Sequence, residues 1–137
     1  MITYTDSLEG ISASKLRGFF VGWPTPPTPD THLKLLRSSY GVVLAIDEQT
    51  GQVIGFITAI SDAVLSAYIP FLEVLPSYQG QGIGQELARL MLEKLSGIYM
   101  VDLQCDAESQ AFYTRLGMQP ASGMMLRNYE RQSGQRR

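Results

Sequence analysis

The residues that most clearly carry chemistry are three glycines at alternate positions, Gly80, Gly82 and Gly84. An apolar run precedes them and an amphipathic pattern follows, which predicts a strand, a tight turn and then a helix. The first N–H groups of a helix have no partner within it, and the helix dipole favours negative charge there. Glycine lets the backbone approach a ligand closely and adopt positive φ. The stretch therefore predicts a binding site for a phosphorylated ligand.

Two common phosphate-binding motifs do not fit this spacing. A dinucleotide-binding fingerprint needs G-x-G-x-x-G, and a P-loop needs G-x-x-x-x-G-K-[ST], whose lysine is missing here. What remains is Gln79-x-x-Gly82-x-Gly84 directly after an apolar strand. Gln79 and Gln81 leave the turn without a cation, so an anion would depend on backbone N–H groups and the helix dipole.

Three other side chains are candidates for reactive groups. Glu73 is a charge inside an apolar strand run, where it either faces a cleft as a general base or points to solvent. Cys105 could suggest an acyl-enzyme, but the single histidine, His32, is distant in sequence and expected on a surface helix, solvated. We therefore expect no Cys-His pair. No metal site is expected either.

Composition narrows the class of protein. The 137 residues suit one domain, taken as residues 1–129, followed by a polar tail at 130–137. A formal net charge of -2 does not suggest a nucleic-acid partner. One cysteine excludes an internal disulfide, and no apolar run approaches the length of a membrane span. We expect a cytoplasmic protein with no membrane partner.

The hydrophobic patterns predict an α+β fold with element order β-α-α-β-β-β-α-β-α-β. Strands and helices should form a mixed, mainly antiparallel central sheet with helices on both faces. A first helix is expected from Ser12 or Ser14, carrying Leu16, Phe19 and Phe20 inward. A strand is expected at 99–105, and a last strand at 123–129, which could pair within one chain or at the edge of a homodimer.

The glycine motif and a second segment together resemble a known family. Gln79-x-x-Gly82-x-Gly84 resembles the Q/R-x-x-G-x-G/A acetyl-CoA motif of the GNAT N-acetyltransferase superfamily. Residues 112–118 resemble its F-Y-x-x-L-G-F/M segment, one helix and one strand later. The resemblance implies the acyl-CoA N-acyltransferase fold, acetyl-CoA as cofactor and transfer of an acetyl group to an amine. Relatives often carry arginine where this chain has its two glutamines.

The resemblance also implies roles for individual residues. Backbone N–H groups of the glycine turn would hold the pyrophosphate, the strand before it would pair with the pantetheine arm, and the Leu75 amide could polarise the thioester carbonyl. Tyr113 would be the general acid that protonates the departing thiolate, with Phe112 packing beside it. The expected cofactor-binding residues are Val74, Leu75, Gln79, Gly80, Gln81, Gly82, Ile83, Gly84, Gln85, Phe112 and Tyr113.

The acceptor is harder to predict. Trp23 beside a proline-rich loop, Tyr68 and Glu73 suggest a pocket for a primary amine with apolar walls and one acidic group. A small-molecule amine is the first expectation, attacked directly in a ternary complex with Tyr113 and Glu73 as catalytic groups. A protein N-terminus or side chain is an alternative acceptor. A non-catalytic acyl-CoA sensor, or a different phosphate ligand at the same turn, remains open.

Overall fold

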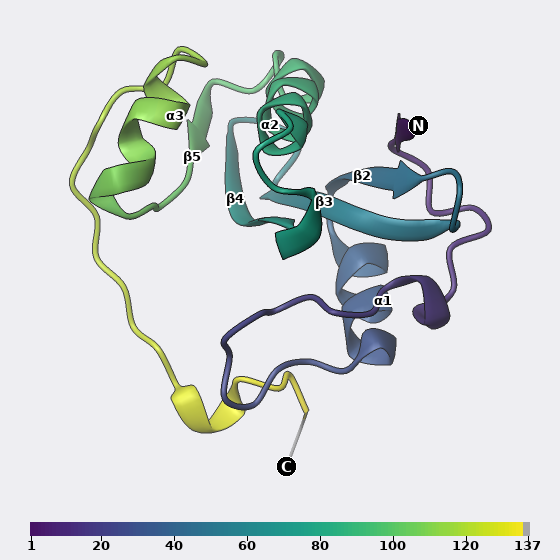
Figure 1. Ribbon diagram of the computed structural model, residues 1–137. Coiled ribbons are helices and arrows are strands. Elements are labelled where there is room, and N and C mark those ends of the chain that lie inside the picture. Colours follow the sequence, from purple (N-terminus) through teal and green to yellow (C-terminus); the bar gives the residue numbers. More distant parts are fainter. Residues whose placement is uncertain (136–137) are drawn as a thin grey trace.

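The protein is built around one five-stranded sheet with the spatial order β1-β2-β3-β4-β5 (Figure 1). The computed structural model describes residues 1–135. Neighbouring strands are antiparallel except for the last pair, β4 and β5, which is parallel. The strands are β1 (Ile2–Thr5), β2 (Gly41–Asp47), β3 (Gln52–Ser61), β4 (Ser66–Val74) and β5 (Met100–Asp102).

Two helices cover opposite faces of the sheet, α1 (Pro29–Ser38) and α2 (Ile83–Lys94), while a third, α3 (Gln110–Thr114), follows β5. The side chain of Thr28 caps α1 by accepting the N–H of Thr31, and Pro29 occupies the first turn, where no N–H is needed. Short 3₁₀ turns lie at Ala13–Lys15, Pro76–Tyr78, Ala107–Ser109 and Tyr129–Arg131.

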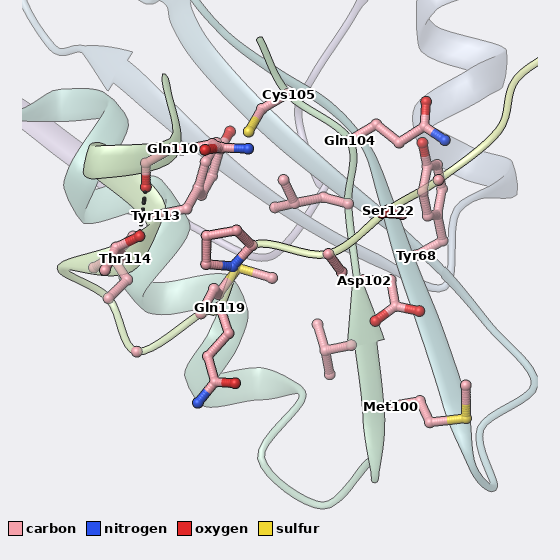
Figure 2. A pocket seen from close by; sticks show the side chains of 18 of the residues that line it. Tyr68, Met100, Asp102, Gln104, Cys105, Gln110, Tyr113, Thr114, Gln119 and Ser122 are labelled. Atoms are coloured by element: carbon pink, nitrogen blue, oxygen red, sulfur yellow. Dashed lines mark hydrogen bonds between the residues drawn. The ribbon is translucent and has the colours of Figure 1, made fainter. Parts of the chain in front are cut away.

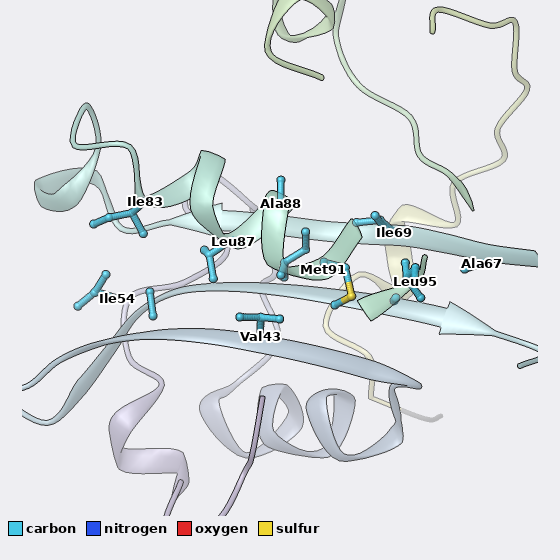
Figure 3. Packing of buried hydrophobic residues seen from close by; sticks show 12 residues of the cluster. Val43, Ile54, Ala67, Ile69, Ile83, Leu87, Ala88, Met91 and Leu95 are labelled. Carbon is cyan, nitrogen blue, oxygen red and sulfur yellow. The ribbon is translucent and has the colours of Figure 1, made fainter. Parts of the chain in front are cut away.

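The packing of α2 on the sheet fixes the position of the glycine turn (Figure 3). Its apolar stripe, which includes Ile83, Leu87 and Met91, is buried against strands β2, β3 and β4. Gly55 of β3 permits this close packing, because a Cβ there would lie 3.0 Å from Leu87 Cδ1. This contact holds α2 with its N-terminus beside the end of β4.

The face under α1 is lined by aromatic rings and differs from the prediction in two ways. The helix expected after Ser12 is wrong: only one 3₁₀ turn forms, and the chain then adopts left-handed conformations at Gly18 (φ 90°) and Phe20 (φ 62°). Phe19 and Phe20 are nevertheless buried, as their apolar character requires. His32 was expected in solvent but is 1% exposed, with its ring among Phe19, Phe20 and Phe56.

Strands β4 and β5 pair over three residues only, from Ser66↔Met100 to Tyr68↔Asp102. The strand expected at 99–105 is therefore shorter than predicted, because residues 103–105 continue without pairing. β4 continues to Val74 paired only with β3. β4 and β5 therefore separate toward the glycine turn. This separation leaves one edge of β4 unpaired near the glycine turn.

The C-terminal region departs most from expectation. The strand predicted at 123–129 does not form within residues 1–135; the segment is extended and runs away from the sheet (Figure 1). The tail then docks near α1: Thr25 N donates to Gln132 Oε1 (3.0 Å), and Gln135 Nε2 donates to Thr31 Oγ1 (2.8 Å). Residues 136–137 of the predicted tail lie outside the described residues.

The predicted fold class is confirmed: a mixed, mainly antiparallel sheet with helices on both faces. Its element order is corrected at two positions, the first helix and the last strand. None of the helices in residues 1–135 is long and apolar enough to cross a membrane.

Candidate active site

The glycine turn forms a row of free backbone donors at the start of α2. The first helical hydrogen bond runs from Glu86 N to Gly82 O (3.1 Å), and the N–H groups of residues 80–85 have no acceptor within residues 1–135. Gly80 (φ 79°) and Gly82 (φ 82°) are left-handed, and a Cβ at either would meet nothing within 4 Å. Six successive N–H groups at a helix N-terminus form an anion-binding cradle.

A cavity of about 550 Å³ lies between this cradle, β4 and α3. The structure gathers nine of the eleven predicted cofactor residues around it: Val74, Gln79, Gly80, Gly82, Ile83, Gly84, Gln85, Phe112 and Tyr113. Leu75 and Gln81 do not line it, whereas Leu72, Tyr78, Glu108 and Ser109, which sequence reasoning missed, do.

The role predicted for the Leu75 amide is wrong. Its N–H donates to Ile54 O at 2.8 Å, so it belongs to the pairing between β4 and β3. Successive peptide groups of a strand point to opposite edges, so the N–H of Val74 faces the other side, where β5 has diverged. Leu72 and Val74, both lining the cavity, therefore present the open edge of β4.

A bulge in β4 reverses the facing of its side chains near Pro70. The register with β3 shifts between Thr58↔Phe71 and Ile60↔Tyr68, which leaves two residues of β4 opposite one of β3. Pro70 lies in this shift, and proline is tolerated in a strand at such an irregularity. Beyond the bulge, Leu72 is two residues before Val74, so strand alternation places both side chains on the cavity face.

Two hydrogen bonds hold the entrance to the cradle. Gln79 Nε2 donates to Val74 O (2.9 Å), which ties the glycine turn to the end of β4. Tyr78 Oη donates to Asp47 Oδ2 (2.6 Å), a contact across 31 residues of sequence. This bond lowers the pKa of the Asp47 carboxyl and raises the pKa of the Tyr78 phenol, since it favours the charged carboxylate with the neutral phenol.

A second and larger cavity, about 1200 Å³, lies on the other side of α3, along β5 (Figure 2). Its lining includes Tyr68, Asp102 and Cys105. Tyr113 is the one described residue that lines both cavities. The Tyr113 side chain therefore lies between the two cavities, within reach of a ligand in either one.

The surroundings of Tyr113 favour its protonated form. Its pKa is raised above the ordinary value of 10, first by burial and second by the nearby Cys105 sulfur. The ring packs edge-on against Phe112, with centroids 4.9 Å apart. Figure 2 shows the Cys105 side chain beside the Tyr113 ring. Cys105 is exposed and lines the larger cavity.

The residues predicted for the acceptor pocket are less well gathered. Tyr68 lines the larger cavity, but Glu73 and Trp23 line neither cavity. The Glu73 carboxylate accepts the N–H of Phe20 at Oε1 (2.9 Å) and the N–H of Val21 at Oε2 (3.3 Å). Trp23 packs its ring against Phe20, with centroids 4.9 Å apart. Glu73 thus anchors the left-handed loop that carries the aromatic rings.

Comparison with known proteins agrees with this geometry. The sequence model of the Acetyltransferase (GNAT) family matches residues 8–118. A "putative acetyltransferase" from Deinococcus radiodurans R1 is 46% identical over 99% of this chain and 94% of its own, with a TM-score of 0.94. A GNAT family acetyltransferase of Streptococcus pneumoniae TIGR4 is 26% identical over 93% and 98% of the two chains, with a TM-score of 0.67.

More distant structures share the fold alone. Glucosamine-6-phosphate N-acetyltransferase from Arabidopsis thaliana is 17% identical over 93% of this chain and 97% of its own, with a TM-score of 0.69. The resemblance inferred from the glycine motif and residues 112–118 is thereby confirmed at the level of family and fold.

Proposed function

Because this chain belongs to the GNAT acetyltransferase family, we propose that it transfers an acetyl group from acetyl-CoA to a primary amine of a small molecule. The amine would attack directly while both substrates are bound. The observation that carries the proposal is the position of Tyr113, a half-buried phenol with a raised pKa that lines both cavities.

The residues of the smaller cavity fit the cofactor. The free N–H groups of residues 80–85 would donate to the pyrophosphate, and the open edge of β4 at Leu72 and Val74 would pair with the pantetheine amides. When bound, acetyl-CoA supplies the acetyl group as an activated thioester. Val74, rather than Leu75, would direct its N–H at the acetyl carbonyl and stabilise negative charge there.

Tyr113 would donate its phenolic proton to the sulfur that leaves. A raised pKa keeps the phenol protonated throughout the neutral range, so the donor is present in nearly every molecule. The ammonium group of the acceptor must also lose a proton before it can attack, which needs a base or a water path. Glu73 remains our candidate for the base, although its side chain lies on the face of β4 opposite to Val74 and accepts the N–H groups of Phe20 and Val21.

Glu73 would then combine two tasks, and the variant Glu73→Gln separates them. Glu73→Gln removes the charge and leaves only one oxygen to accept the two N–H groups of Phe20 and Val21. A base role in addition to the anchor predicts a shifted pH profile of kcat together with a lower unfolding temperature. A purely anchoring role predicts a lower unfolding temperature and an unshifted profile.

The acceptor would reach Tyr113 from the side of the larger cavity. Tyr68 lines that cavity and supplies an aromatic wall, whereas Trp23 packs against Phe20 and Phe71 and lines neither cavity. The aromatic wall suits an alkyl or arylalkyl amine. Protein amines are the alternative acceptors, and a broad panel would reveal them.

The decisive experiment is a thiol-release assay with acetyl-CoA against a panel of amines, run on the wild-type protein and on Tyr113→Phe. We expect turnover of at least one small amine and a fall in kcat of about 10²-fold in the variant, at unchanged CoA affinity. A protein that binds CoA but turns over no amine would be a sensor instead. Tight binding of another nucleotide without CoA binding would overturn the cofactor assignment.

A further inference from the structure

The cavity of about 550 Å³ beside the glycine turn contains an acidic side chain and no basic one. None of the described residues that line it is lysine, arginine or histidine, whereas Glu108 is an acid. The attraction of this cavity for an anion therefore comes from the backbone, at the six free N–H groups of residues 80–85 and the N-terminus of α2.

The basic residues of α2 are already paired with carboxylates. Arg89 lies between two acids, with its Nε 2.6 Å from Glu86 Oε1 and its Nη1 3.1 Å from Glu93 Oε2. Lys94, in the last turn of the helix, donates to Asp6 Oδ2 at 3.0 Å. Because each of these cations is neutralised by a partner, α2 offers an incoming phosphate little beyond its N-terminal N–H groups.

Glu108 lies on the α3 side of the cavity, in the 3₁₀ turn that leads into that helix. Helical spacing places it on the same face as Phe112, which also lines the cavity. The Glu108 side chain is exposed and forms no ion pair within residues 1–135. Arg115, which follows α3, does not line the cavity. The Glu108 carboxylate is therefore an uncompensated negative charge beside the anion-binding cradle.

This charge distribution matters because CoA carries phosphate in two places, a pyrophosphate and a separate 3′-phosphate on the ribose. The second group adds a charge of about −1.5 to −2 at neutral pH. The cradle suits the pyrophosphate, and the effect of the helix dipole is confined to the first turn. Another phosphate would need its own donors, which are commonly arginine or lysine side chains. The lining of this cavity offers it the repulsive carboxylate of Glu108 instead.

We propose that this site binds its cofactor through the pyrophosphate and the pantetheine arm alone, so that dephospho-CoA, which lacks the 3′-phosphate, binds as tightly as CoA. Glu108 determines this lack of preference, because its charge opposes any attraction of the cradle for a further phosphate. The inference rests on the proposed function, since it takes acetyl-CoA as the cofactor. The ligand class of the site is then the pantetheine nucleotides, with or without the 3′-phosphate.

Isothermal titration calorimetry of the full chain with CoA and with dephospho-CoA, at one salt concentration, tests the proposal. The two dissociation constants should agree within about threefold, whereas a lost charge-assisted contact to the 3′-phosphate would weaken dephospho-CoA by about tenfold or more. A preference for CoA larger than threefold would overturn this inference and leave the proposed function standing. If neither ligand bound, the proposed cofactor itself would be overturned.

A charge reversal at Glu108 tests the role of this residue. Glu108→Lys should raise the preference for CoA over dephospho-CoA to about tenfold, and Glu108→Gln should give a smaller preference, because it removes the repulsion without adding a cation. Glu9→Lys is the matched control: it makes the same charge change at an exposed site that lines neither cavity. Each preference compares two ligands on one variant, so a general loss of folded protein cancels. Equal preferences in Glu108→Lys and Glu9→Lys would overturn the role of Glu108.

Discussion

The glycine turn and the C-terminal segment are both backbone sites with unsatisfied hydrogen-bonding groups, but they differ in how they are supported. The N–H groups of residues 80–85 are fixed by α2, by Gln79 and by Tyr78 on a packed sheet. Residues 119–127 have no such support within the described chain. The glycine turn is a rigid site that a small ligand can complete. The C-terminal segment is an exposed stretch whose backbone groups would be satisfied only by another extended segment.

The contrast shows that unsatisfied groups alone do not identify a ligand. A row of N–H groups with a concave cavity and positive φ glycines fits an anion. A row of alternating N–H and C=O groups with exposed apolar side chains fits a strand. Substitutions in different parts of the molecule test this difference, beginning with the largest expected effect.

Gly82→Val should reduce CoA affinity by about 100-fold or more, because a β-branched residue disfavours the left-handed conformation at φ 82° and distorts the cradle. Isothermal titration calorimetry with CoA measures this directly. Gly97→Val is the matched control, since Gly97 has no positive φ and a Cβ there meets nothing within 4 Å. Equal losses in both variants would contradict a specific role for the turn.

Tyr78→Phe should weaken CoA binding by several-fold, about threefold to tenfold, without changing kcat. The phenyl ring keeps its place in the cavity wall, but the bond that holds the turn to Asp47 is lost. Fluorescence-monitored CoA titration would measure the change. If Asp47→Asn, which retains a hydrogen-bond acceptor, weakened binding as much as Tyr78→Phe, the charge rather than the bond would be responsible.

His32→Leu should remove a pH dependence of stability that belongs to the α1 face. Burial lowers the pKa of His32 from 6.5 to about 4, so the unfolded chain binds a proton more readily in between. Stability is therefore full above pH 6.5 and falls as the pH drops toward 4. Both ring nitrogens lack a hydrogen-bond partner among residues 1–135, so leucine should flatten this fall.

Thermal unfolding between pH 4 and pH 7 measures that change, with His32→Gln as a polar control that keeps the buried hydrogen-bonding groups without titrating. Persistence of the wild-type pH dependence in His32→Leu would assign it to other groups. CoA affinity should hardly change in either variant, because His32 lines neither cavity.

Leu126→Asp should have the smallest effect on the cofactor side. It should leave CoA affinity within about twofold of the wild type, since Leu126 is 83% exposed and lines neither cavity. Calorimetry with CoA measures this. A large loss of CoA affinity would mean that the two regions are not independent.

The sequence predicted the strand, the glycine turn and the helix around the candidate cofactor cavity well, because the signals for these elements are local. Alternating glycines, an apolar strand and an amphipathic helix are adjacent, and each element is stabilised by its own pattern. The Leu75 amide was misassigned because the edge to which a peptide group points depends on pairing with β3. The reversal at Pro70 was missed for the same reason: a bulge is defined by two strands, not one.

The errors at the two ends of the chain have a related cause. Ser12 to Phe20 has helical apolar spacing, yet the left-handed residues Gly18 and Phe20 bring the rings onto the sheet without a helix. Residues 123–129 have the composition of a strand, but they pair with no strand in the described chain. His32 was predicted to be solvated because histidine is polar. The aromatic rings that surround it come from residues distant in sequence and are brought together only by the tertiary fold.

The most direct test of the account is a crystal structure of the protein with CoA. We predict that the pyrophosphate accepts hydrogen bonds from N–H groups of residues 80–85, and that the pantetheine arm lies along the β4 edge at Leu72 and Val74. The sulfur should lie within hydrogen-bonding reach of the Tyr113 hydroxyl. A pyrophosphate bound away from the glycine turn, or a sulfur remote from Tyr113, would contradict the account.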